Sequence, residues 1–136
     1  MQKNLKLLLI FICSLLLELI ALSAAKFLGI ELKFNYGIAF GLFNDFKYIA
    51  LILSCIALAV ILFLIFYKFK DFKINLALAL AGGGAAANFA ERLYLGFVID
   101  YINILYSFNL ADVEIILGLA SAMGLYLLER KRELDC

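Results

Sequence analysis

Histidine, proline and tryptophan are all absent from this chain of 136 residues. Without histidine, the chain cannot form a Ser-His or Cys-His nucleophile pair or the usual zinc sites. Cysteine is scarce, and the sequence contains three: Cys13, Cys55 and Cys136. Their number is odd and they form no Cys-x-x-Cys motif. We therefore expect no disulfide, no metal and no other cofactor, and we interpret the cysteines in apolar runs as buried small apolar residues.

Charge is also scarce. Charged residues make up 17% of the chain and the formal net charge is +1, so the chain lacks the basic face that a nucleic-acid-binding protein needs. By contrast, 67% of the residues are hydrophobic and the mean hydropathy is +1.07. A soluble domain is far less apolar, so the composition predicts an integral membrane protein.

Four apolar stretches are long enough to cross a bilayer as helices. A hydrocarbon core about 30 Å thick needs about 20 helical residues, and the stretches that qualify are 5–25, 48–67, 74–93 and 110–128. The first is too long for the apolar region of a signal peptide, so we interpret it as a retained helix. The sequence thus predicts an all-α membrane protein in which residues 1–136 form a single membrane domain.

Basic residues indicate the orientation of these spans, because short cytoplasmic loops are enriched in lysine and arginine. Eight of the twelve basic residues precede the first span, join the second to the third, or follow the fourth: Lys3, Lys6, Lys68, Lys70, Lys73, Arg130, Lys131 and Arg132. Both termini are therefore predicted to be cytoplasmic. The segments 26–47 and 94–109 would then face outward.

Polar residues gather near the outward end of the third span. Asn88 and Arg92 are four residues apart and share one helix face. Arg92 could simply extend to the lipid headgroups, or the pair could direct hydrogen-bond donors at carboxylates or carbonyls. Residues 82–87, just before them, are all glycine or alanine, which favours close packing between helices in a membrane.

Two carboxylates, Asp100 and Asp112, lie in and just after the second outward segment. Considered singly, Asp100 is a solvated loop acid, and Asp112 completes a capping box with Asn109 at the start of the fourth span. Considered together, two acids held close in a low dielectric cannot both ionise. One could then deprotonate a water while the other, protonated, polarises a carbonyl. This is aspartic-protease chemistry, which needs neither histidine nor metal.

The first outward segment is too short to be a span. Alternation of apolar and charged residues over 30–34 predicts a strand, and 35–37 predicts a turn. Residues 38–43 are predicted to form a second strand or an interfacial helix. Asn35 could serve the turn alone, or its amide could hold the backbone of a substrate.

Four motifs follow one another along the chain: Asn35-Tyr36-Gly37-Ile38-Ala39-Phe40-Gly41, Asn88 to Arg92, Val98-Ile99-Asp100-Tyr101 and Phe108-Asn109-Leu110-Ala111-Asp112. Together they resemble the motifs of the lipoprotein signal peptidase (signal peptidase II) family. The resemblance implies four transmembrane helices with a small outward β-cradle and an interfacial helix. It also implies a location in the bacterial cytoplasmic (inner) membrane.

The resemblance further implies an activity. Members of the family are aspartic endopeptidases that cleave the signal peptide of a prolipoprotein before a cysteine carrying diacylglycerol, on the extracytoplasmic face. Asp100 and Asp112 match the catalytic pair, and the supporting positions are Asn35, Gly37, Asn88, Arg92, Asn109 and Ala111. The expected partners are lipidated prolipoproteins and membrane lipids, with no nucleic acid and no cofactor, and the chain is expected to be a monomer.

The chain departs from the family pattern at three positions. Ala87 and Glu91 stand where the family usually has glycine and aspartate, and Leu22 stands where it has an aspartate four residues before Lys26. Glutamate keeps the charge of aspartate on a longer side chain, so we expect the role of Glu91 to be partly retained. Glu18, one helical turn before Leu22, is a candidate substitute for the missing aspartate.

Other classes of protein remain open from the residues alone. Intramembrane acids often mark ion or proton pathways, so one alternative is a small transport protein that uses Glu18, Asp100, Asp112 and Glu114. A second is a non-catalytic membrane scaffold built on the small residues 82–87. A third is a Ser-Lys peptidase that uses Ser23 and Lys26.

Overall fold

The computed structural model of the protein describes residues 2–37 and 47–135, and most of them are helical. The helices are α1 (Gln2–Phe27), α2 (Lys47–Phe63) with a π-helical extension η2 (Leu64–Lys68), α3 (Phe72–Leu95) and α4 (Leu110–Leu134). Each predicted span lies within one helix, or within α2 and η2 for the second. Among the described residues, α1, the stretch Tyr48–Phe66 and α4 are long and apolar enough to cross a membrane.

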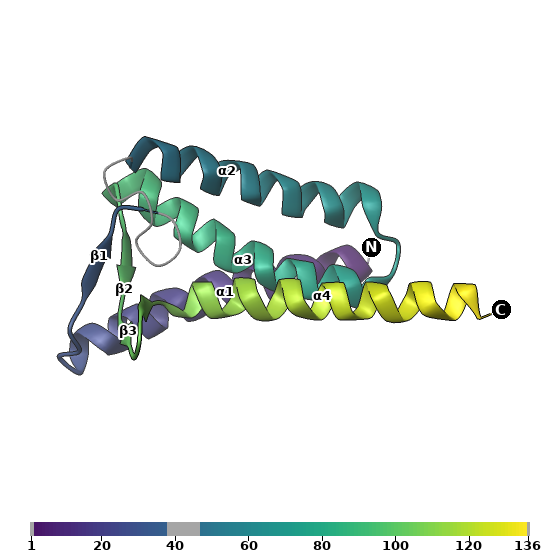
Figure 1. The fold of residues 1–136 in the computed structure, drawn as a ribbon. Helices are drawn as coiled ribbons and strands as arrows, with labels where there is room; N and C mark the ends of the chain where they lie inside the picture. The colour runs from purple at the N-terminus through teal and green to yellow at the C-terminus, as the bar shows by residue number, and fades with distance from the viewer. Residues whose placement is uncertain (1, 38–46, 136) are drawn as a thin grey trace.

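The remaining helix, α3, is the centre of the bundle and packs against α1, α2 and α4 (Figure 1). Small residues make this possible. A Cβ added to Gly84 would lie 2.5 Å from the carbonyl oxygen of Ala111, and one added to Gly83 would collide with Ser14. Glycine at these positions therefore lets α4 and α1 approach α3 more closely than any larger residue would allow.

Two short antiparallel pairs of strands lie at one end of the bundle. β1 (Lys33–Asn35) pairs with β2 (Val98–Asp100), with Lys33 opposite Asp100 and Asn35 opposite Val98. β3 (Ile102–Asn103) pairs with β4 (Ser107–Phe108). Strands in this part of the chain were expected on two grounds, the family resemblance and the alternation of residues around position 32.

The first strand begins later than predicted. Residues 30–32 are not in β1, because α1 continues to Phe27 and ends in a turn at Gly29, whose φ is +68°. The amide of Ile30 donates to the carbonyl of Ala25 across this turn (3.0 Å), so Ile30 is still tied to the helix end. The predicted second strand or interfacial helix at 38–43 lies outside the described residues.

The two ends of the bundle differ in their charge. Both termini and the turn between α2 and α3 lie at the end opposite to the strands (Figure 1). The basic clusters around Lys3, Lys70 and Lys131 are at that end, since each adjoins a terminus or the turn. The polar motif residues are on or next to the strands at the other end. The fold thus separates these three basic clusters from the predicted site.

The outer surface of the bundle is apolar. Leu19 and Ile20 on α1 and Ile52 on α2 are 60%, 64% and 58% exposed. The interpretation of the cysteines as buried was wrong, because Cys13 and Cys55 are both exposed on this surface. Apolar side chains around a whole bundle are unfavourable in water and suit contact with lipid.

Gly118 of α4 offers a test of the close helix packing. A Cβ there would lie 2.6 Å from the carbonyl oxygen of Ala77 and 2.7 Å from the amide nitrogen of Ala81. We expect Gly118→Ala to push α4 away from α3 and to destabilise the protein by about 1–3 kcal/mol, as overpacking does. The measurement is thermal unfolding in detergent. Gly124→Ala is the matched control, because a Cβ at Gly124 meets nothing within 4 Å. Equal melting temperatures for the two variants would contradict the packing.

Candidate active site

Asp100 is the last residue of β2 and is almost completely buried, with 3% of its surface exposed. Its Oδ2 accepts a hydrogen bond from the side-chain amide of Asn35 (3.2 Å), which lies on the paired strand β1. Within the part of the chain that the structure describes, its Oδ1 is buried and has no hydrogen-bond partner. One carboxylate oxygen of Asp100 is therefore fixed by a hydrogen bond, and the other has no hydrogen-bond donor among the described residues.

Asp112 is fixed by the start of α4. Asn109 is the N-cap residue, and its Oδ1 accepts from the amide of Asp112 (2.9 Å). Asp112 Oδ2 in turn accepts from the amide of Asn109 (3.3 Å). This confirms the predicted capping box. Because Asn109 is fully buried, the cap holds the carboxylate of Asp112 in one place.

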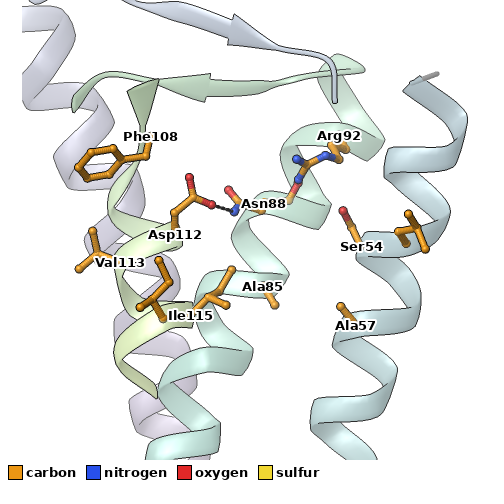
Figure 2. A pocket seen from close by; sticks show the side chains of 11 residues that line it. Ser54, Ala57, Ala85, Asn88, Arg92, Phe108, Asp112, Val113 and Ile115 are labelled. Atoms are coloured by element: carbon orange, nitrogen blue, oxygen red, sulfur yellow. Dashed lines mark hydrogen bonds between the residues drawn. The ribbon is translucent and has the colours of Figure 1, made fainter. Parts of the chain in front are cut away.

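Asn88 of α3 joins this cap to the centre of the bundle. Its Nδ2 donates to Oδ1 of Asp112 (2.8 Å), as the dashed line in Figure 2 shows. Its Oδ1 accepts from Nδ2 of Asn109 (2.9 Å). Both ends of the Asn88 amide are thus used, and they hold Asp112 and its N-cap residue together.

Arg92, one turn further along α3, points inward rather than to the lipid headgroups. It is 9% exposed, and its guanidinium donates to the carbonyl oxygens of Gly37 (2.8 Å) and Asn88 (3.3 Å). The amide of Gly37 donates to Oδ1 of Asn35 (3.0 Å), and Asn35 holds Asp100. A continuous chain of contacts therefore leads from Asp100 to Asp112.

Ala111, the remaining predicted support residue, has no exposed surface. Its carbonyl oxygen lies against Gly84, where α3 and α4 approach each other closely. Because Ala111 is fully buried, a larger side chain at this position would overpack the start of α4 beside Asp112.

Burial raises the pKa of Asp100 to about 7, from an ordinary value of 3.8, because the charged form loses its hydration. The negative charge of Asp112 raises this pKa further, so the two acids interact electrostatically. The hydrogen bond from Asn35 and the positive charge of Arg92 favour the ionised form and act in the opposite direction, while the charge of Glu91 raises the pKa.

A cavity of about 660 Å³ opens between α2, α3 and α4 (Figure 2). Three of the predicted site residues line it, namely Asn88, Arg92 and Asp112. The other lining residues are mostly apolar: Leu53, Ser54, Ala57, Ala85, Phe108, Val113, Ile115 and Ile116. Such a cavity, apolar with a few converging polar groups, is the usual form of a binding site.

The sequence indicated a role for Glu91 without its partner, and it gave no sign of a role for Ser54. Glu91 accepts a hydrogen bond from the amide of Ile99 (2.8 Å) and so supports β2 next to Asp100. Ser54 brings the only hydroxyl from α2 among the described residues that line the cavity. The contact of Glu91 depends on how α3 meets β2, and no spacing in the sequence reports it. Ser54 stands alone in an apolar run, without any motif.

The Ser-Lys alternative gains no support from the structure. The hydroxyl of Ser23 lies on the exposed face of α1 and donates to the carbonyl of Leu19 (2.7 Å), within its own helix.

Across residues 2–37 and 47–135, no group of three or more histidine, cysteine, aspartate or glutamate residues could hold a metal ion.

Comparison with known proteins connects this geometry to a family. Residues 4–128 match the family model described as signal peptidase (SPase) II. Lipoprotein signal peptidases of Wigglesworthia glossinidia brevipalpis and Desulfitobacterium hafniense (strain DSM 10664 / DCB-2) are 39% and 37% identical to this chain, over 62% and 73% of it. The aligned regions cover 61% and 68% of those two proteins, so the chain spans about two thirds of their length or less.

The fold also has solved counterparts. A bacterial membrane enzyme determined by the in meso method superposes with a TM-score of 0.74 at 20% sequence identity, covering 92% of this chain and 88% of that one. A second such structure gives a TM-score of 0.71, also at 20% identity, over 90% of this chain and 92% of that one. These likenesses establish the arrangement of helices and strands.

The elevated pKa of Asp100 can be tested by infrared difference spectroscopy of the wild type against Asp100→Asn. We expect the band of a protonated carboxyl group at pH 5 and its loss as the pH rises through about 7. In Asn35→Ala the loss should move to higher pH, because the lost hydrogen bond favours the ionised form. A band lost near pH 4 in the wild type would contradict the burial of Asp100.

The same shift has a consequence for stability. Since the pKa of Asp100 is higher in the folded protein than the ordinary value of 3.8, its contribution to the free energy of unfolding is fully present below that value. The contribution is lost as the pH rises through about 7. The stability of Asp100→Asn should therefore depend less on pH than that of the wild type over this interval.

Proposed function

The chain belongs to the signal peptidase II family, and from that premise we propose that it is an aspartic endopeptidase that removes signal peptides from lipidated prolipoproteins. Cleavage would occur before a cysteine that carries diacylglycerol. The observation that carries the proposal is the linkage of two acids, Asp100 and Asp112, through Asn35, Gly37, Arg92 and Asn88. Homologues named lipoprotein signal peptidase support the choice of substrate.

In the proposed mechanism the two acids share one proton. The ionised acid takes a proton from a water molecule, and the resulting hydroxide attacks the carbonyl carbon of the scissile amide. The protonated acid donates a hydrogen bond to the carbonyl oxygen, where negative charge develops. Collapse of the tetrahedral intermediate then breaks the C–N bond, and the amine leaves with a proton from the pair. The proton belongs to Asp100 and Asp112 jointly.

The support residues act on the geometry of this pair. Asn35 orients Asp100 by holding one of its oxygens, whereas Asn88 and the backbone amide of Asn109 hold the two oxygens of Asp112. Arg92 ties the segment at Gly37 to α3 and adds a positive charge near both acids. The apolar walls of the cavity would bind the apolar part of the signal peptide. The scissile bond would then lie at the polar end of the cavity, next to Asp112.

We also propose the arrangement in the membrane. All four helices span it, both termini are cytoplasmic, and the strands and both acids face the extracytoplasmic side of the bacterial cytoplasmic membrane. The orientation is supported by eight of the twelve basic residues, which lie at the end with the termini, as cytoplasmic segments do. That α3 spans the membrane with the other helices is supported by its central place, because three helices shield it from lipid. A central helix can therefore be less apolar than its neighbours.

Replacement of either acid tests the proposed chemistry. We expect Asp100→Asn and Asp112→Asn each to lower kcat for a diacylglyceryl prolipoprotein by roughly 10²–10⁴-fold, because each removes a proton donor or acceptor at the scissile bond. The measurement is cleavage by the purified protein, followed by mass spectrometry. Glu133→Gln is the matched control, since Glu133 is exposed near the C-terminal end of α4. Wild-type cleavage by either folded aspartate variant would rule out this mechanism.

The proposed orientation can be checked by labelling single cysteines in a background that lacks Cys13, Cys55 and Cys136. Leu105→Cys is in the β3–β4 connection, where Leu105 is 90% exposed, and Lys70→Cys is between η2 and α3. A membrane-impermeant maleimide should label Leu105→Cys in intact spheroplasts and Lys70→Cys only after lysis. The reverse pattern would overturn the orientation.

A further inference from the structure

Glu18 lies in the middle of the apolar helix α1 and is 2% exposed. A buried carboxyl group in such a place is costly unless its oxygens are hydrogen-bonded. Oε2 of Glu18 accepts two hydrogen bonds, from the amide of Ala111 (2.8 Å) and from the hydroxyl of Tyr101 (3.0 Å). Its Oε1 has no partner among the residues that the structure describes.

Tyr101 extends this contact to a second amide of α4. Its hydroxyl donates to Glu18 and accepts from the amide of Leu110 (3.1 Å). Burial raises the pKa of Tyr101 far above its ordinary range, so the hydroxyl keeps its proton and remains a donor. The first amides of a helix have no partner within the helix. Glu18 thus accepts directly from the amide of Ala111, and it holds the tyrosine hydroxyl that accepts from the amide of Leu110. The amide of Asp112 donates to the side chain of Asn109.

The residues that Glu18 contacts are the sequence neighbours of the two acids. Tyr101 follows Asp100, and Ala111 precedes Asp112. The acids themselves are on different elements, β2 and α4, and the β3–β4 hairpin separates them along the chain. One side chain from α1 therefore joins the two backbone segments that carry the acids.

We propose that Glu18 is a positioning residue that sets the relative placement of Asp100 and Asp112 by holding Tyr101 and the start of α4 with a single carboxyl oxygen. The proposal rests on the proposed function. It assigns Glu18 a role that needs a hydrogen-bond acceptor and no transfer of a proton.

If Glu18 acts only as a hydrogen-bond acceptor, glutamine should replace it and leucine should not. Glutamine has nearly the same shape and offers one carbonyl oxygen, which can accept from both Ala111 and Tyr101. Leucine has a similar volume and no acceptor, so Glu18→Leu leaves the amide of Ala111 and the hydroxyl of Tyr101 unpaired in a buried place. A role in proton transport would require a group that titrates, and neither variant provides one.

The experiment compares Glu18→Leu, Glu18→Gln and the wild type in cleavage of a diacylglyceryl prolipoprotein. We expect Glu18→Leu to lower kcat by roughly 10²-fold, since a displacement of about 1 Å at reacting groups has that effect. KM should change much less than kcat, because the apolar residues that line the cavity keep their places. Glu18→Gln should restore most of the lost kcat. Ser23→Ala, an exposed polar position on the same helix, is the matched control.

A second measurement is independent of activity. Hydrogen exchange of the amides of Leu110 and Ala111 should be faster in Glu18→Leu than in the wild type, and unchanged in Glu18→Gln. Exchange around Gly118, in the middle of α4, should be the same in all three. If Glu18→Leu does not fold, Tyr101→Phe takes its place, because it removes one hydroxyl, keeps the ring in the core and should expose Leu110 selectively.

Two results would overturn the proposal. One is a kcat for Glu18→Leu equal to that of the wild type, and the other is a Glu18→Gln variant as inactive as Glu18→Leu, which would show that the carboxyl must titrate. Failure of the proposed function is recognised differently, as a wild type that does not cleave the prolipoprotein. In that case the exchange of Leu110 and Ala111 still decides whether Glu18 holds the start of α4.

Discussion

Asn88 forms hydrogen bonds with two residues at the point where α3 meets α4, and the arrangement of the strand-bearing end of the molecule depends on these contacts. Its amide nitrogen donates to Asp112, and its oxygen accepts from Asn109, the residue that begins α4. An asparagine buried in an apolar bundle is stable only when both of its polar atoms are paired. The start of α4, the direction of the Asp112 carboxylate and the rotation of α3 are therefore fixed together.

The small residues of α3 are what bring these groups within reach. Gly84 lies one turn before Asn88 and against the carbonyl of Ala111, so α4 approaches α3 where its first turn presents Asp112. Arg92, one turn after Asn88, reaches Gly37 and thereby the strand that carries Asn35. Successive turns of a single helix thus supply close packing, a hold on one acid and a link toward the other. The apolar surroundings make each of these polar contacts strong.

The local parts of this arrangement were predictable and the connections between elements were not. The capping box of Asn109 and Asp112 is a pattern of adjacent residues, and the structure confirms it. The inward direction of Arg92 was left open, because a helix position does not say which neighbour the side chain meets. The partners of Glu18 lie 83 and 93 residues further along the chain. The exposure of Cys13 reversed the expectation, since in a membrane bundle apolar residues face lipid as readily as the core.

Asp100 and Asp112 are held by separate sets of contacts, yet they would perform one reaction. The most direct test is the kcat of the double variant Asp100→Asn/Asp112→Asn on a diacylglyceryl prolipoprotein, compared with the two single variants in a double-mutant cycle. Groups that act as a unit are strongly non-additive. We expect the double variant to lose no more activity than the more damaged single variant. Losses that multiply would contradict a shared proton and show that the acids act independently.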